Sequence, residues 1–176
     1  MNSIIVIIGN SSSGKSSLAL RLTQKFHLAH LDLDTLAWEN QATPMRRRLF
    51  NSIQDITNFI ESYNNCIIEG CYGDLITEIL PYIYLLIFLN PDVNTCLNNA
   101  KNRLWESHKY DSLEEQNSNL PLLEQWIKDY YIRQDELSYY YHQQLFNSFS
   151  GNKLQFDRNW DDNLLTIISN FLDRNH

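Results

Sequence analysis

The stretch from Ile4 to Leu22, IIVIIGNSSSGKSSLALRL, limits the possible folds of this chain more than any other. Its first five residues are all apolar, without polar alternation, which is typical of a strand buried on both faces of a parallel sheet. The next residues fit the pattern G-x-x-x-x-G-K-[ST], whose fixed positions are Gly9, Gly14, Lys15 and Ser16. Apolar residues then recur at the spacing of a helix, at Leu18, Ala19 and Leu22. Strand, glycine loop and helix in this order predict a phosphate-binding site.

The residue types in the loop suit a triphosphate better than an ordinary Gly/Ser loop would. Glycines let the backbone turn tightly, so that successive N–H groups form an anion nest at a helix N-terminus. Lys15 is expected to reach the β- and γ-phosphates, and the hydroxyl of Ser16 is expected to ligate Mg²⁺. We therefore predict ATP and Mg²⁺ as the cofactors. The residues expected to contact the nucleotide here are Gly9, Ser12, Ser13, Gly14, Lys15, Ser16 and Ser17.

The rest of the chain alternates between strand-like and helix-like segments. Further strands are expected at 28–33, 66–68, 83–89 and 153–156, and helices at 46–63, 92–105, 121–149 and around 164–171. Asn90 is predicted to cap the helix after the fourth strand, with Pro91 at its first helical position. Residues 106–119 are polar and weakly patterned, so we expect a mobile loop there. The alternation predicts an α/β fold with a parallel sheet, helices on both faces, and ligands beyond the carboxyl ends of the strands.

Three carboxylates follow predicted strands and are therefore expected at this edge. Asp32 and Asp34 are two residues apart, which places both on the same side of an extended chain. One is predicted to hold Mg²⁺ through water and the other to accept the proton of a substrate hydroxyl, unless they cap the next helix or turn. Glu69 ends the third strand, where it either assists the metal or is an ordinary carboxylate at a strand end.

Several arginines are candidates for binding or catalysis, and for some of them a structural role is the alternative. The cluster Arg46 to Arg48 either clamps an anionic substrate or forms a solvated helix end. Arg103 and Arg133 are candidates for stabilising charge on a transferring phosphoryl group, because a guanidinium fork matches phosphate oxygens. For Arg133, an ion pair with the nearby Asp135 is the alternative. Arg158 follows the last strand and is expected to border the adenine.

Length and charge limit the domain count and weigh against some classes of function. A chain of 176 residues is expected to be one domain, 1–176. The net charge of −7 weighs against nucleic acid as the substrate, because such surfaces are usually basic. The apolar runs are too short to span a bilayer, so no membrane partner is predicted. Three cysteines without metal spacing fit a reduced, cytoplasmic setting, and a monomer and a homodimer both remain open.

The motifs GNSSSGKSSLALRL and HLDLDTLAWE resemble those of the small P-loop kinases of the adenylate kinase and shikimate kinase superfamily. The resemblance looks strongest to bacterial adenylate-kinase-like proteins often labelled topology modulation proteins. It implies a three-layer fold with a five-stranded parallel sheet in the order 2-3-1-4-5. It also implies a substrate-binding segment at about 34–63 and a lid at about 104–120. In shikimate-kinase-like members the acid pair after the second strand serves Mg²⁺ and substrate, which falls here on Asp32 and Asp34.

The chain departs from the adenylate kinase pattern on the acceptor side. IIEGCYGD is similar to the strand that ends in an aspartate and is followed by an arginine, but here Glu69 replaces the aspartate and no arginine follows. IRQDE is similar to the segment after the lid, which supports a catalytic Arg133, whereas His142 lies near the place of a second arginine. Both missing arginines would contact a nucleoside monophosphate, so these departures weigh against AMP as the acceptor.

Three functions follow as hypotheses. The first is an ATP- and Mg²⁺-dependent phosphotransferase with a small-molecule or nucleotide acceptor, in which Lys15, Asp34, Arg133 and Arg103 are the catalytic residues and Ser16, Asp32 and Glu69 hold the metal. The second is a nucleotide-binding regulatory protein with little turnover. The third is a kinase of nucleic-acid ends, which only the basic cluster Arg46 to Arg48 supports.

Overall fold

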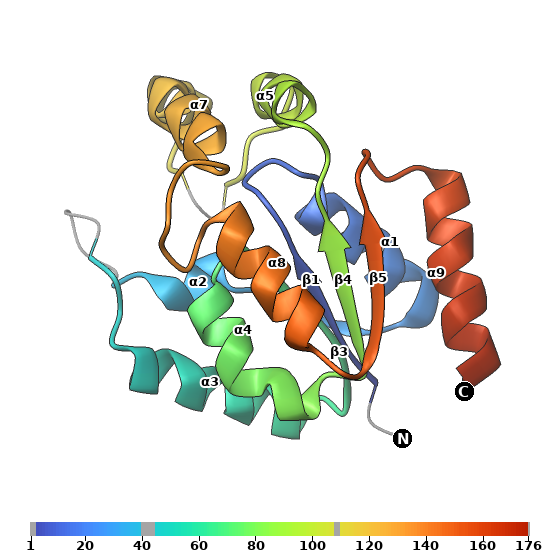
Figure 1. Cartoon of the computed structure of the whole chain (residues 1–176). Helices are drawn as coiled ribbons and strands as arrows, with labels where there is room; N and C mark the ends of the chain where they lie inside the picture. The colour runs from blue at the N-terminus through green and yellow to red at the C-terminus, as the bar shows by residue number, and fades with distance from the viewer. Residues whose placement is uncertain (1–2, 40–44, 108–109, 176) are drawn as a thin grey trace.

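A five-stranded parallel sheet forms the centre of the computed structural model, which describes residues 3–39, 45–107 and 110–175 (Figure 1). The strands are β1 (Ser3–Ile8), β2 (Ala29–Asp32), β3 (Asn65–Gly70), β4 (Leu85–Leu89) and β5 (Asn152–Phe156). They lie in the order β2-β3-β1-β4-β5, and every pairing is parallel. The expected α/β class and the strand order implied by the resemblance are confirmed.

The side chains of the central strand point alternately into two hydrophobic cores, one on each face of the sheet. Ile4, Val6 and Ile8 pack against α2 (Asp34–Ala37), α3 (Leu49–Ser62), α4 (Gly73–Ile79) and α8 (Tyr139–Ser148). Ile5 and Ile7 pack against α1 (Lys15–Phe26) and α9 (Asp162–Asn175) on the opposite face. Because β1 is buried on both faces, its unbroken apolar run is the pattern that this position requires. Figure 1 shows the three layers, with α4 and α8 on the face opposite α1.

A third, smaller core lies beyond the carboxyl ends of the strands. It joins α5 (Val93–Lys101) and α7 (Leu120–Asp129) through Cys96, Ala100 and Ile127. Figure 1 shows these two helices side by side above the arrowheads, and the short helix α6 (Leu113–Ser118) connects to α7. The expected acceptor segment 34–63 and lid 104–120 include residues 40–44 and 108–109, which lie outside the described residues.

Four local predictions were wrong: three are described here, and the fourth, on residues 121–149, in the next paragraph. The helix expected over 46–63 begins only at Leu49. Asp92, not Asn90, caps α5, because its carboxylate accepts from the N–H of Thr95. The segment 106–119, expected as a mobile loop, contains α6, which Ser112 caps in the same way.

The single helix expected over 121–149 is two helices, α7 and α8. Ser138 caps α8 by accepting from the N–H of Tyr141, and Asp135 accepts from the N–H of Leu137 in the connecting turn. Short polar side chains that bond to nearby backbone groups favour such a break over a continuous helix.

The remaining elements are short. A 3₁₀ helix, η1 (Leu80–Tyr82), leads into β4, and the longest helices, α3 and α9, have 14 residues each. None of the helices in the described ranges has both the length and the apolar content to cross a lipid bilayer.

Candidate functional site

The loop between β1 and α1 adopts a backbone that only glycine tolerates at two positions. Gly9 has a φ of 155°, and a Cβ there would lie 2.1 Å from the carbonyl oxygen of Leu89 in the neighbouring strand. Gly14, the N-cap of α1, has a φ of 94°, and a Cβ there would lie 3.0 Å from the indole of Trp160. Such close approach of the backbone leaves a concave loop at a helix N-terminus, which is the geometry of an anion nest.

Several polar groups in this loop are buried. The hydroxyls of Ser12 and Ser13 form no hydrogen bond within the described residues. Lys15 is 7% exposed, and its ammonium group donates to the carbonyl oxygen of Asn10 at 2.7 Å. No carboxylate of the described chain forms an ion pair with Lys15. A buried cation beside two unsatisfied hydroxyls provides donors for an anionic group.

The acid pair after β2 lies at a strand-to-helix junction. The prediction that Asp32 and Asp34 share one side of an extended chain was wrong, because β2 ends at Asp32 and Asp34 opens α2. The carboxylate of Asp32 accepts from the N–H of Asp34 at 2.9 Å, so the capping alternative holds for Asp32. Both side chains nevertheless line the same cleft.

Glu69 lies beside Asp32, because the parallel register of β2 and β3 pairs these two positions. The glutamate is 2% exposed, and its Oε1 has no hydrogen-bond partner among the described residues. This oxygen lies 3.7 Å from Nε2 of His30. A buried carboxylate oxygen that accepts no hydrogen bond is costly, so Oε1 is suited to accept from a bound water or to contact a cation.

These residues meet in one cleft at the carboxyl ends of the strands. Of the predicted site residues, the structure brings the following to its lining: Ser12, Lys15, Ser16, Asp32, Asp34, Glu69 and Arg103. The lining also contains Ser11, Gly70, Cys71, Tyr110 and Leu123. Ligands of open parallel sheets bind at this edge, so the cleft lies where the fold predicts.

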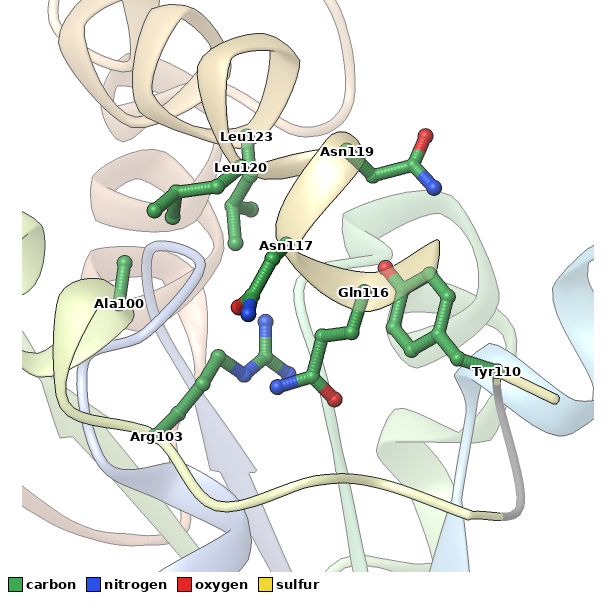
Figure 2. A pocket seen from close by; sticks show the side chains of 8 residues that line it. All are labelled: Ala100, Arg103, Tyr110, Gln116, Asn117, Asn119, Leu120 and Leu123. Carbon is green, nitrogen blue, oxygen red and sulfur yellow. The ribbon is translucent and has the colours of Figure 1, made fainter. Parts of the chain in front are cut away.

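Arg103 belongs to both this cleft and a neighbouring pocket between α5 and α7. Its guanidinium forms an ion pair with Glu106. Figure 2 shows Arg103 pointing toward the amide groups of Gln116 and Asn117. Gln116 is buried, accepts from the N–H of Glu106 at 2.8 Å and donates to the carbonyl of Leu104 at 3.1 Å. The small helix α6 therefore holds the backbone that follows Arg103.

Neither of the other two predicted arginines lines the cleft in this structure. Arg133 forms an ion pair with Asp135 at 2.6 Å, and its guanidinium lies 3.7 Å from the ring centre of Trp126. This is the ion-pair alternative considered for that residue. Arg158 is paired with Asp161 at 2.6 Å and is half-exposed. Its neighbour Trp160 instead packs against Gly14 of the phosphate loop.

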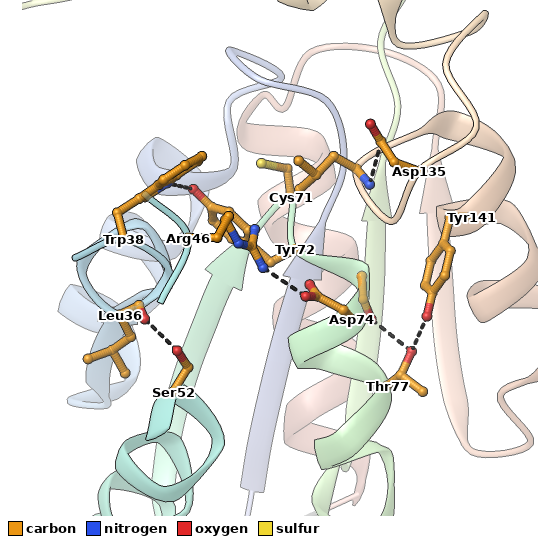
Figure 3. Close-up of polar contacts among 12 residues, drawn as sticks. Leu36, Trp38, Arg46, Ser52, Cys71, Tyr72, Asp74, Thr77, Asp135 and Tyr141 are labelled. Carbon is orange, nitrogen blue, oxygen red and sulfur yellow. Dashed lines mark hydrogen bonds and ion pairs between the residues drawn. The ribbon is translucent and has the colours of Figure 1, made fainter. Parts of the chain in front are cut away.

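The sequence interpretation missed two aromatic side chains near Asp34, those of Trp38 and Tyr72. Figure 3 shows both, and we call them the aromatic wall. Trp38 donates from its indole to the hydroxyl of Tyr72 at 2.7 Å, and Tyr72 donates to Asp34 at 2.6 Å. Burial raises the pKa of Tyr72 well above its usual value, so the phenol stays a proton donor to Asp34. The only sequence signal for Tyr72 was its place three residues after Glu69, at the end of β3.

The guanidinium of Arg46 packs against the same wall. It lies 4.8 Å from the ring centre of Tyr72 and 5.6 Å from that of Trp38. Asp74 forms an ion pair with it at 2.7 Å. The next residue, Arg47, is paired with Asp55 of α3 at 2.6 Å. Two members of the basic cluster are therefore neutralised by acids of their own chain.

A buried histidine, His142, forms a hydrogen bond with the backbone of Cys71, a residue of the cleft lining. His142 is fully buried and lies 2.7 Å from the hydroxyl of Tyr130 and 2.8 Å from the carbonyl oxygen of Cys71. A carbonyl only accepts, so Nε2 carries the proton and donates to Cys71, while Nδ1 accepts from Tyr130. Burial lowers the pKa of His142 to about 3, so the ring is neutral. Burial also raises the pKa of the Cys71 thiol to about 12, which argues against a nucleophile there.

The donor set suits Mg²⁺ with water in its coordination shell. No group of three His, Cys, Asp or Glu side chains is arranged as a metal site in the described part of the chain. Mg²⁺ usually keeps several waters and takes only one or two carboxylates besides phosphate oxygens. Ser16, Asp32 and Glu69 line one cleft, and the hydroxyl of Ser16 and the two carboxylates fit this requirement.

No family model and no curated protein matches the chain. Solved structures share its fold. A deoxyadenosine kinase from M. mycoides with bound dATP aligns with a TM-score of 0.54 and 14% identity, over 97% of this chain and 99% of that one. A sugar kinase from Janibacter sp. HTCC2649 aligns at 0.57 and 12% identity, over 98% and 95% of the two chains.

A shikimate kinase from Bacteroides thetaiotaomicron aligns at 0.56 and 11% identity, over 97% of this chain and 98% of that one. Identities this low establish similarity of fold. The finer resemblance to topology modulation proteins stays a prediction. The chain has the fold of P-loop kinases, with its sheet in the order 2-3-1-4-5.

Proposed function

We propose that the protein is a phosphotransferase that moves the γ-phosphoryl group of ATP, with Mg²⁺, to the hydroxyl of a small acceptor. One observation carries this proposal: the phosphate loop with Lys15 and the carboxylates Asp32 and Asp34 line a single cleft. A phosphoryl donor site and a proton acceptor in one cleft are the two parts that such a transfer requires. The solved structures of the same fold include three that are named as kinases, which supports the reaction class.

Each part of the cleft then has a role. The loop amides and Lys15 bind the β- and γ-phosphates, because donors at a helix N-terminus stabilise anions. Ser16 with Asp32 or Glu69 holds Mg²⁺, which supplies charge neutralisation when it is bound. Arg103 stabilises charge on the transferring group in this proposal, which its presence in the lining of the cleft supports.

Asp34 is the general base of this proposal. The acceptor oxygen forms a bond to the γ-phosphorus, the bond from that phosphorus to the β–γ bridging oxygen breaks, and ADP leaves with the electron pair. The acceptor's proton passes to the carboxylate of Asp34. Tyr72 donates to one oxygen of this carboxylate at 2.6 Å and so fixes its orientation toward the acceptor.

The structure weakens the support for a role on nucleic-acid ends, because two of the three arginines in the basic cluster are paired with acids. Arg46 and Arg47, which would bind the phosphate backbone, are engaged with Asp74 and Asp55. A regulatory nucleotide-binding protein with little turnover is distinguished from an enzyme by the assay below.

The test is transfer from γ-labelled ATP with Mg²⁺ to a panel of nucleosides, nucleotides, sugars and small hydroxy acids. We expect labelled product from one class of acceptor and a loss of about 10²–10⁴-fold in kcat for Asp34→Asn. A matched control is Asp55→Asn, which removes a carboxylate that is paired on α3 and does not line the cleft. Tight ATP binding without transfer to any compound would contradict the proposal and favour the regulatory protein.

A further inference from the structure

We infer that Asn99, on α5, is a positioning residue for the phosphate loop: its side-chain amide holds Ser12 in the left-handed backbone conformation on which the anion nest depends. This role rests on the proposed function, but only on the binding of nucleotide phosphates by the loop. Neither the acceptor nor the transfer step is needed for it.

Ser12 has a backbone conformation that residues with a side chain rarely adopt. Its φ is 57°, and among the described residues other than glycine only His27 also has a positive φ. His27 ends α1, where a left-handed residue is common. Ser12 instead is the third residue of a turn, which the N–H of Ser13 closes on the carbonyl oxygen of Asn10 at 3.3 Å. A left-handed residue at that position is usually glycine, because a Cβ there is strained.

The same conformation is what an anion nest requires. A nest forms where residues of opposite hand follow one another, because their successive N–H groups then point to the same side. Ser12 supplies a left-handed residue in the middle of the loop, between Gly9 and Gly14. Its hydroxyl forms no hydrogen bond within the described residues, so its own side chain does not hold the backbone. A strained residue of this kind persists only where the surrounding structure stabilises it.

Asn99 provides a stabilising contact from outside the loop. Its Nδ2 donates to the carbonyl oxygen of Ser12 at 2.9 Å and to Oδ1 of Asn159 at 2.9 Å. A carbonyl only accepts, so the amide nitrogen must face Ser12, and both of its hydrogens are engaged. Asn159, which follows β5, also donates to Oδ1 of Asn99 at 3.4 Å and so helps to keep the amide in this orientation. Figure 1 shows α5 above the loop that joins β1 to α1.

A second contact anchors the loop to the neighbouring helix α7. The side chain of Asn10 is 2% exposed and donates from its amide to the carbonyl oxygen of Ile127 at 3.1 Å. Ile127 belongs, with Cys96 and Ala100, to the small core that joins α5 and α7. The turn is therefore bonded at two points to the same pair of helices, and Asn99 holds the point at which the backbone is strained.

The experiment measures the dissociation constants of ATP, GTP and inorganic tripolyphosphate with Mg²⁺ and the full chain, by titration calorimetry. We expect Asn99→Ala to weaken the binding of all three by about five- to tenfold, which corresponds to the loss of one hydrogen bond. The losses should be equal, because a distorted nest affects the phosphates that the three ligands share. Asn98→Ala, at an exposed neighbouring position on α5, is the matched control and should change each constant by less than about twofold.

Substitutions of Ser12 separate positioning from a general effect on stability. Ser12→Ala and Ser12→Gly both remove the hydroxyl, and they differ only in the Cβ that the left-handed region disfavours. In the Ser12→Ala background we expect Asn99→Ala to cost the same five- to tenfold in affinity. In the Ser12→Gly background we expect it to cost less than about twofold, because glycine adopts this conformation without support. Thermal unfolding establishes that each variant is folded. If Asn99→Ala is not, Asn99→Leu, which keeps the volume of the side chain, takes its place.

The outcomes separate this role from the function on which it rests. A loss of affinity for the nucleotides but not for tripolyphosphate would mean that Asn99 contacts the nucleoside, and would overturn the positioning role. Equal losses in the Ser12→Ala and Ser12→Gly backgrounds would also overturn it, because the backbone conformation would then not be the cause. Binding of all three ligands without phosphoryl transfer would count against the phosphotransferase alone, and rescue by Ser12→Gly would still support the positioning role. Absence of binding of all three to the native chain would overturn both.

Discussion

The two ends of the cleft are built in different ways. At the phosphate end, the donors are backbone amides and one lysine within residues 9–17, in a loop whose shape depends on glycines at positive φ. At the other end, around Asp34, the supporting groups come from elements far apart in the sequence: Trp38, Arg46, Tyr72 and Asp74 meet beside Asp34 only after folding. The first end is determined by local backbone geometry, and the second by contacts between side chains.

This difference determines how each end should respond to substitution. A local backbone site has no alternative arrangement, so a single change is expected to abolish its function. A site assembled from several ion pairs and hydrogen bonds is expected to lose affinity and specificity by steps, because the remaining members keep their partners. The predictions below test this contrast.

Lys15→Met should give the largest effect. Removing the ammonium group takes away the only cation within the phosphate loop, and we expect kcat/KM for ATP to fall by about 10²–10³-fold. Steady-state kinetics with γ-labelled ATP measure this. Lys25→Met, on the same helix but bonded to Ser169, is the control. A loss under tenfold for Lys15→Met would mean that the loop amides suffice.

Gly9→Ala should destabilise the fold. The added Cβ would lie 2.1 Å from the carbonyl oxygen of Leu89, and this backbone contact cannot move aside. We expect the free energy of unfolding to fall by about 3 kcal/mol, measured by urea denaturation. In the matched variant Gly151→Ala the new Cβ meets the far end of the Phe149 side chain, which can shift where a backbone carbonyl cannot, so the cost should be smaller. Equal costs for the two variants would refute the backbone explanation.

Substitutions of Arg103 and Arg133 should have different effects, because only Arg103 lines the cleft. Arg103→Gln removes a cation from the lining and should lower kcat by about 10–100-fold. Arg133→Gln removes an ion pair and a stacking contact with Trp126, and should lower the free energy of unfolding by about 1 kcal/mol with a smaller change in kcat. Thermal unfolding and kinetics on both variants provide the comparison. If Arg133→Gln loses more kcat than Arg103→Gln, Arg133 must reach the reacting group in a closed state.

The smallest expected effect is that of His142 on the pH dependence of the free energy of unfolding. Its pKa is about 3 when folded and about 6.5 in an unfolded chain, so below pH 6.5 the unfolded state binds a proton that the folded state does not. Stability is therefore lost as pH falls, by about 0.8 kcal/mol at pH 6 relative to pH 7.5. Denaturation at several pH values should show this slope in the native protein and a weaker slope in His142→Gln. Parallel slopes would mean that another group titrates.

The phosphate end could be predicted from the sequence, because the strand, the loop and the helix that form it are consecutive in the chain. The apolar run before Gly9 predicted a central strand, and the register of Lys15 and Ser16 at the start of a helix followed from the spacing. The helix boundaries around 90–149 could not be predicted. Asp92, Ser112 and Ser138 each cap a helix there, but other polar residues nearby were equally good candidates for the cap. Local propensities differ too little to choose among such candidates.

The sequence by itself determined the fold class, the phosphate loop and the carboxylates that gather at the ends of β2 and β3, because periodicity and short motifs act within a few residues of each other. Only the tertiary structure decided which arginines face the cleft and which are neutralised. Arg103 reaches the lining, whereas Arg46 and Arg133 are held by Asp74 and Asp135. The physical reason is that an arginine side chain is long and flexible, and the partner it chooses depends on acids that folding brings from elsewhere in the chain.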